Sequence, residues 1–229
     1  MMKKAEVLVP LFTTFKKDGS VDYETFEKIE KYVLDKGADG VYVGGSSAEC
    51  FSLTQEERKK CLEVAVKAAQ GKTVIAHVGA IGTGIACDLA KHAKEVGADA
   101  VASVPPFYHG FQPGEIKNYY TALADASDSV PVVVYNVPGT TGVGLSLAMF
   151  QDILSDKRVV AVKYTDVNYY VMDRIKKLTG TYIFSGADEC FAYALMAGAD
   201  GCIGTSCNYA TEKFINIKKS FDKGDIKTC

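Results

Sequence analysis

The chain has 229 residues, with 26 Lys plus Arg against 28 Asp plus Glu, and therefore a net charge of −2. A near-neutral chain has no basic field to hold nucleic acid or an anionic membrane, and its 48% hydrophobic and 24% charged residues are typical of a globular domain. Its seven cysteines are odd in number and lack CxxC spacing, which argues against a disulfide framework and a structural zinc site.

The start of the chain has a faint likeness to a signal peptide, because residues 1–4 read Met-Met-Lys-Lys. Glu6, however, interrupts the apolar stretch that such a signal requires. No apolar run approaches the length of a bilayer span. Together with the unpaired cysteines, these features predict a cytoplasmic protein with no membrane partner and no nucleic-acid partner.

Eight short apolar runs, rich in β-branched residues, alternate with longer amphipathic segments. Runs that hardly alternate between apolar and polar residues are typical of parallel strands covered on both faces. In the segments between them apolar residues recur at helical spacing, and Thr54 with Glu57 forms a capping box that opens the second helix. The predicted strands are residues 7–15, 41–44, 74–78, 100–104, 130–136, 159–164, 182–185 and 201–204.

The sequence Gly-Ala-Asp recurs at residues 37–39, 97–99 and 198–200, each time between a predicted helix and a predicted strand. The glycine supplies the left-handed turn that ends a helix, and the aspartate can hydrogen-bond local backbone before the strand begins. Eight strands and eight helices in alternation predict an α/β fold, a (β/α)₈ TIM barrel formed by residues 1–229 as a single domain. A doubly wound open sheet is the alternative, but no GxGxxG follows the first strand.

Lys163 is the only charged residue in the predicted strand at residues 159–164. Functional residues of such barrels lie at the carboxyl ends of strands. Burial disfavours the ammonium form, and a neutral amine there can attack a carbonyl and form a Schiff base. The alternative is a structural lysine that pairs with Asp188 or Glu189.

Tyr135 lies near the end of the preceding strand, one barrel position from Lys163. A phenol beside a Schiff base can transfer a proton to or from a substrate hydroxyl. The alternative is a core tyrosine with a satisfied hydroxyl group.

Two glycine-containing turns are candidate anion sites. Ser46 and Ser47 follow two glycines at the end of the second strand, where backbone N–H groups and hydroxyls suit a carboxylate or a phosphate. Residues 201–204 have a similar character, and an ordinary βα turn is the alternative in both cases.

The seventh strand is followed by Asp188 and Glu189, which can bind a polyhydroxylated substrate or a metal, although Asp188 can instead cap the next helix. Metal-assisted chemistry is not favoured, because His77, His92 and His109 lack ligand spacing and are predicted to be structural. We expect no metal and no cofactor.

Four motifs occur in order: Gly-Gly-Ser-Ser-Ala-Glu at 44–49, Tyr-Asn-Val-Pro at 135–138, Lys-Tyr-Thr at 163–165 and Gly-Ala-Asp-Glu at 186–189. Together they resemble the pyruvate-dependent class I aldolase family that contains dihydrodipicolinate synthase and N-acetylneuraminate lyase. The last two motifs are similar to the lyase branch. The segment after Tyr-Asn-Val-Pro lacks the arginine that is usual in the synthase branch.

The resemblance implies cleavage of N-acetylneuraminate to N-acetylmannosamine and pyruvate. Lys163 would form the Schiff base with the C2 ketone, and Ser46 and Ser47 would hold the carboxylate. Tyr135 would accept the C4 hydroxyl proton as the C3–C4 bond breaks. Tyr108 matches a tyrosine that a neighbouring subunit often contributes in this family, which implies a homotetramer. The residues implied to contact the hydroxylated tail of the substrate are Thr165, Gly186, Asp188, Glu189 and Thr205.

The chain departs from the family pattern at several places, among them Ser47 for threonine, Thr205 for serine and Thr14 for proline. Two further departures have larger consequences. Ala48 stands where the family usually has glycine, which restricts the backbone if that position needs a positive φ. The sequence ends at residues 221–229, in or just after the eighth helix, so we expect a barrel that lacks the usual C-terminal helical extension.

Three other functions remain open. One is another aldolase or synthase of the family, acting on a 2-keto-3-deoxy sugar acid or resembling dihydrodipicolinate synthase. The second is a non-catalytic truncated barrel. The third is a phosphate-binding isomerase barrel, which would leave Lys163 and Tyr135 without roles.

Overall fold

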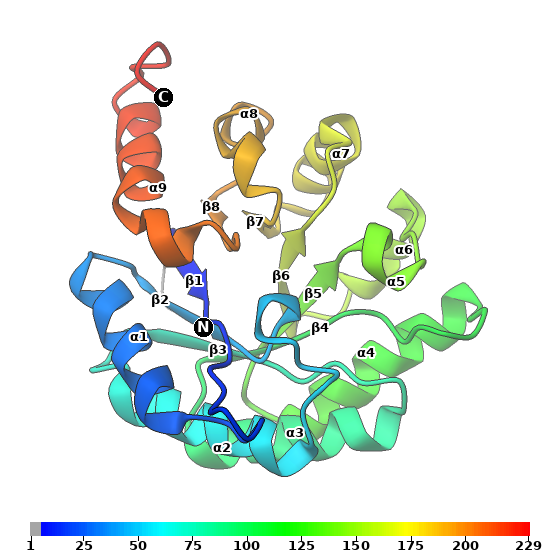
Figure 1. The fold of residues 1–229 in the computed structure, drawn as a ribbon. Coiled ribbons are helices and arrows are strands. Elements are labelled where there is room, and N and C mark those ends of the chain that lie inside the picture. Colours follow the sequence, from blue (N-terminus) through cyan, green and yellow to red (C-terminus); the bar gives the residue numbers. More distant parts are fainter. Residues whose placement is uncertain (1–5) are drawn as a thin grey trace.

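The computed structural model describes residues 6–229, and the signal-like residues 1–4 lie outside this part of the chain. Eight parallel strands form one sheet in sequence order (Figure 1). Val7 pairs in parallel with Cys202, and the Cys202 N–H donates to the Glu6 carbonyl at 2.7 Å, so the last strand meets the first. The (β/α)₈ barrel is thereby confirmed. The strands are β1 (Leu8–Pro10), β2 (Gly40–Val43), β3 (Thr73–His77), β4 (Ala100–Ser103), β5 (Val132–Asn136), β6 (Val159–Tyr164), β7 (Tyr182–Ser185) and β8 (Gly201–Cys202).

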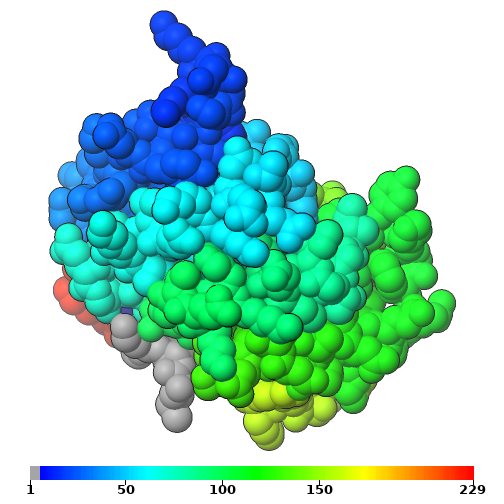
Figure 2. Space-filling view, turned by 90° about the horizontal axis from the view of Figure 1, so that it is seen from below, coloured from blue at the N-terminus to red at the C-terminus, as the bar shows by residue number. Residues whose placement is uncertain are grey.

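Helices surround the strands (Figure 1). The last helix, α9, packs against the first strand, β1. In Figure 2 the face seen from below passes from blue through cyan to green, as expected when successive helices cover the barrel in chain order. The α-helices within residues 6–229 are α1 (Tyr23–Asp35), α2 (Gln55–Ala68), α3 (Thr83–Val96), α4 (Pro113–Ser127), α5 (Pro138–Thr141), α6 (Leu147–Ile153), α7 (Tyr169–Thr179), α8 (Phe191–Met196) and α9 (Cys207–Asp222), and the 3₁₀-helices are η1 (Ser46–Ala48) and η2 (Asp188–Cys190).

The number of helices exceeds the eight that were predicted, because two helices connect β5 to β6. Pro138 opens the single turn α5, since its fixed φ suits the first helical position. Gly142, with a φ of 68°, ends that turn in the left-handed region. The capping box at Thr54 and Glu57 is confirmed at the start of α2.

The first and last strands are shorter than predicted. After Pro10 the chain leaves the sheet and forms an exposed turn, in which Phe15 and Val21 pair in an antiparallel bridge and Gly19 has a φ of 86°. This segment belongs to the dark-blue part of Figure 2. The predicted strand at residues 201–204 contains only Gly201 and Cys202, because the chain then bends toward α9.

Two apolar layers hold the barrel together. The larger lies between the strands and the helices, and the smaller fills the barrel interior. Interior residues include Leu8, Tyr42, Ile75, Tyr135 and Phe184, each on a different strand. Polar side chains can therefore meet only beyond this apolar interior, at the carboxyl ends of the strands. No helix within residues 6–229 is long and apolar enough to cross a membrane.

The three Gly-Ala-Asp joints tie neighbouring strands together at the opposite end of the barrel. The glycines are left-handed as predicted, with φ from 90° to 100°. The aspartates bond backbone of a neighbouring strand, where the prediction was local backbone. Asp39 accepts the N–H groups of Glu6 and Val7 at 2.9 Å, and Asp200 accepts the N–H of Ile183 at 2.8 Å. Each carboxylate therefore links the start of its own strand to that of an adjacent strand.

Replacing Asp39 with alanine is expected to lower the free energy of unfolding by about 2 kcal/mol, because two part-buried N–H groups lose their acceptor. Urea unfolding followed by circular dichroism at pH 7 measures the change. Asp35→Ala is the matched control, since Asp35 is exposed at the end of α1 and should change stability by less than about 0.5 kcal/mol. Equal losses in the two variants would contradict this role for Asp39.

Candidate active site

Lys163 projects from β6 into the barrel, where its side chain is 4% exposed. It lies in register with Tyr135 on β5 and Phe184 on β7. The predicted alternative of an ion pair with Asp188 or Glu189 is absent from residues 6–229. Asp188 instead accepts the N–H of Ser206 at 2.6 Å, and Glu189 is exposed. The amine is therefore buried without a carboxylate to hold it.

Tyr135 lies beside this amine, with its ring centroid 4.0 Å from Lys163 Nζ. Its hydroxyl lies 3.3 Å from Ser46 Oγ. Burial opposes ionisation of the phenol, but the adjacent Lys163 charge and the hydrogen bond with Ser46 outweigh it and lower the pKa of Tyr135 below its usual value. A phenol with a lowered pKa in this position is suited to exchange protons with a bound molecule.

Ser46 and Ser47 lie in η1, directly after β2. Ser47 Oγ lies 2.7 Å from Thr205 Oγ1, so the turns after β2 and β8 meet over the barrel mouth. Gly44 and Glu49 are in the left-handed region here, with φ of 70° and 55°, whereas Ala48 is not among the residues with positive φ. The alanine that departs from the family pattern therefore adopts this turn without strain.

An open pocket of about 330 Å³ lies over Lys163. Its lining includes seven of the predicted site residues, together with Val137, Thr140 and Ile203. Val137 and Ile203 lie in segments singled out from the sequence but had no predicted role, and Thr140 was not predicted. Gly186 borders the pocket closely, because a Cβ there would lie 1.9 Å from Thr165 Oγ1 and 3.3 Å from Lys163 Cε. The predicted residues in its lining are Ser46, Ser47, Tyr135, Lys163, Thr165, Gly186 and Thr205.

The remaining three predicted residues lie outside the lining of this pocket. Asp188 does not cap the next helix, because its carboxylate binds the Ser206 N–H in the turn after β8 and its Cβ packs close to Gly204. Glu189 lies exposed on η2. Tyr108 follows β4 and is 81% exposed, with a φ of 81°. Their roles in binding remain predictions.

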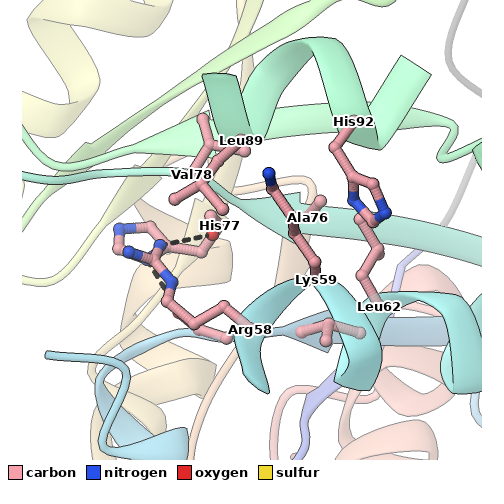
Figure 3. Close-up of a pocket in the computed structure, with 10 residues that line it drawn as sticks. Arg58, Lys59, Leu62, Ala76, His77, Val78, Leu89 and His92 are labelled. Atoms are coloured by element: carbon pink, nitrogen blue, oxygen red, sulfur yellow. Dashed lines mark hydrogen bonds between the residues drawn. The ribbon is translucent and has the colours of Figure 1, made fainter. Parts of the chain in front are cut away.

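A buried arginine, Arg58, holds the end of β3, where Figure 3 shows it beside His77. Arg58 reaches from α2 and donates to the carbonyls of His77 and Gly79 at 2.9 and 3.0 Å. Burial, followed by the charge of Arg58, lowers the pKa of His77 well below its usual value. The neutral His77 ring donates from Nδ1 to the Gly44 carbonyl at 2.8 Å. This structural role agrees with the prediction for His77.

The pocket over Lys163 is lined by an amine, a phenol and hydroxyl groups. Within residues 6–229 no group of three or more His, Cys, Asp or Glu side chains is placed to hold a metal ion. The buried amine, the phenol with its lowered pKa and the two serine hydroxyls define the class: a (β/α)₈ barrel with a buried lysine at its mouth.

The chain belongs to the dihydrodipicolinate synthetase family, whose model matches residues 3–229. It is 38% identical over 224 residues to an N-acetylneuraminate lyase of Escherichia coli strain SMS-3-5 / SECEC, an alignment that covers 97% of this chain and 75% of the relative. The crystal structure of CdNal from Clostridium difficile in complex with mannosamine has a TM-score of 0.96 and 31% identity, over 98% of this chain and 78% of that one. Ruminococcus gnavus sialic acid aldolase has a TM-score of 0.94 and 33% identity, over 97% and 75%.

Proposed function

We propose that this chain is a class I aldolase that cleaves N-acetylneuraminate to N-acetylmannosamine and pyruvate. The observation that carries the proposal is the buried Lys163 amine, which faces an open pocket beside Tyr135 and Ser46 and has no ion-pair partner within residues 6–229. The family and the lyase and aldolase names of its relatives support the same reaction.

The reaction begins at Lys163. Its neutral amine attacks the C2 ketone of the 2-keto acid, and loss of water leaves a protonated imine. Tyr135 accepts the C4 hydroxyl proton as the C3–C4 bond breaks, and the bonding electrons move into the imine to give an enamine. Protonation at C3 and hydrolysis then release pyruvate and restore the amine.

The other lining residues bind the two ends of the substrate. Ser46 and Ser47 donate hydrogen bonds to the carboxylate, which places the C2 ketone over Lys163. The hydroxyls of Thr165 and Thr205 lie farther round the same pocket and bind the hydroxylated tail. Gly186 leaves room for that tail, and Asp188 and Glu189, on η2 just after it, would bind the end of the tail that extends beyond the pocket lining.

Assembly and location belong to the same proposal. Tyr108 is largely exposed, and its ring contacts that of the neighbouring His109. Because of this exposure, the side chain is accessible to another copy of the chain. We propose a cytoplasmic homotetramer of single barrels in which Tyr108 completes the proton relay of a neighbouring subunit.

The test is a panel of 2-keto acids assayed for pyruvate release. N-acetylneuraminate is expected to be cleaved. Pyruvate release from a 2-keto-3-deoxy sugar acid alone would assign the chain to another aldolase of the family.

A second experiment traps the imine: incubation with pyruvate and borohydride, followed by mass spectrometry of peptides, is expected to place a stable adduct on Lys163. A complete lack of adduct would indicate the non-catalytic barrel.

Replacing Tyr135 with phenylalanine is expected to lower kcat for N-acetylneuraminate cleavage on the order of a hundredfold, because the proton acceptor at C4 is lost. Trapping of the pyruvate imine by borohydride should fall much less, since that reaction breaks no C3–C4 bond. Steady-state kinetics and trapping rates measured on the same variant separate the two steps. An equal loss in both would show that Tyr135 acts only in imine formation.

A further inference from the structure

Tyr42, on β2, is a buried residue of the barrel interior that the proposed mechanism does not use. Its side chain is fully buried and is among the largest such side chains in the protein. Its hydroxyl has no hydrogen-bond partner among the described residues, and burial raises its pKa well above the usual value. Burying a hydroxyl without a hydrogen-bond partner costs free energy, so the hydroxyl does not stabilise the fold. Any favourable contribution of Tyr42 at this position therefore comes from its ring.

That ring faces the reacting amine. Lys163 Nζ lies 4.4 Å from the Tyr42 centroid and 4.0 Å from the Tyr135 centroid. The two rings are 6.0 Å apart and nearly perpendicular, at 81°, so the nitrogen contacts both π faces. Gly45 leaves the space that the Tyr42 ring occupies, because a Cβ at Gly45 would lie 2.6 Å from Cε1 of the ring.

The electrostatic surroundings of the nitrogen are therefore aromatic rather than anionic. The face of an aromatic ring attracts a cation, and this attraction is stronger where water is excluded. A carboxylate at the same place would bind a positive charge through a hydrogen bond of fixed direction. Two ring faces stabilise a positive charge on the nitrogen without accepting a hydrogen bond along a fixed direction.

We propose that the π face of Tyr42 is a catalytic group that stabilises the protonated imine on Lys163, an inference that rests on the proposed function. In imine formation the hydroxyl of the carbinolamine takes a proton and leaves as water, while the nitrogen lone pair forms the C=N bond. The nitrogen then bears one hydrogen and one positive charge, and it lies next to both rings. The rings stabilise this cation from its formation until the C3–C4 bond breaks. The bonding electrons then neutralise the charge.

The experiment compares Tyr42→Phe with Tyr42→Leu by borohydride trapping of pyruvate. Phenylalanine keeps the ring and removes only the unpartnered hydroxyl, so its trapping rate should stay within about twofold of the wild-type rate. Leucine removes the π face, and its rate should fall about tenfold or more. Phe184→Leu is the matched control: it removes a buried ring in register with Lys163 that makes no cation–π contact with Nζ, and its rate should not change.

Fluorinated phenylalanines at position 42 extend the test without altering the size of the ring greatly. Each added fluorine weakens the negative face, so the logarithm of the trapping rate should fall in proportion to the number of fluorines. Equal rates for the Phe and Leu variants, or no trend with fluorination, would overturn the role of Tyr42 alone. If the wild-type protein forms no adduct on Lys163, the proposed function fails and this inference fails with it.

Discussion

Replacing Lys163 with methionine is expected to abolish the pyruvate adduct and to lower cleavage of N-acetylneuraminate on the order of 10⁴-fold. Methionine has a similar length and fills the same space, but it offers no amine to attack the ketone. The fold should remain, since Lys163 forms no ion pair within residues 6–229 and its 4% exposed amine carries a desolvation cost. The free energy of unfolding should therefore stay equal or rise.

Mass spectrometry after borohydride trapping and a coupled assay of pyruvate release measure the two effects. Lys28→Met is the matched control, because Lys28 is exposed on α1 and does not line the pocket. That variant should keep both adduct and activity. An adduct found on a different lysine, or cleavage that persists in Lys163→Met, would remove the amine from the mechanism.

The alternation of apolar runs and helical segments was sufficient to predict the barrel, because each strand of a parallel barrel is covered on both faces and leaves an unbroken apolar run. It could not predict where the end strands stop. Residues 11–15 continue the apolar run of β1, yet Phe15 pairs with Val21 in a turn of its own. Strand ends depend on the partner available in space, and the local sequence does not contain that information.

The sequence was sufficient to predict those residues of the candidate site that lie at, or directly after, the end of a strand. Lys163, Tyr135 and Ser46 meet for this reason, since the carboxyl ends of all the strands open at one mouth. The contact between Asp188 and the Ser206 N–H could not be predicted in the same way, because Ser206 comes from the turn after β8.

Tyr42 could not be singled out from the sequence. In an apolar strand, Tyr42 has the pattern of a core residue, and only the barrel curvature shows that its ring faces Lys163 from four strands away. Thr140 was missed for a similar reason, because the single turn α5 carries it back over the mouth. Distances across the barrel interior are set by the closed sheet as a whole.

Because of Glu30, we expect part of the folding stability to be lost as the pH rises from 5 to 8. This glutamate lies fully buried on α1, and neither carboxylate oxygen has a hydrogen-bond partner among the described residues. Burial, and then repulsion from Glu27, raises its pKa from 4.5 to about 8, against a smaller opposing effect of Lys31. The folded protein therefore keeps Glu30 protonated at neutral pH, while the unfolded chain ionises it.

The sign follows from the proton count. Between pH 4.5 and pH 8 the folded state holds a proton on Glu30 that the unfolded state has lost, so the contribution of Glu30 to stability falls as the pH rises. The loss from this group amounts to about 3 kcal/mol by pH 7 and about 5 kcal/mol above pH 8. Glutamine has nearly the same shape as protonated glutamate and does not titrate. Glu30→Gln should therefore gain stability over the wild-type protein as the pH increases.

Urea unfolding at several pH values from 5 to 9 measures this difference. The gap between Glu30→Gln and the wild-type protein should widen steadily up to about pH 8 and then level off, because both folded and unfolded states are ionised above that pH. Glu24→Gln is the matched control on the same helix, where the exposed side chain should give a gap that does not vary with pH in this range. A constant gap for Glu30→Gln as well would mean that the buried carboxyl ionises alike in both states, and would require a partner that stabilises its charge in the folded protein.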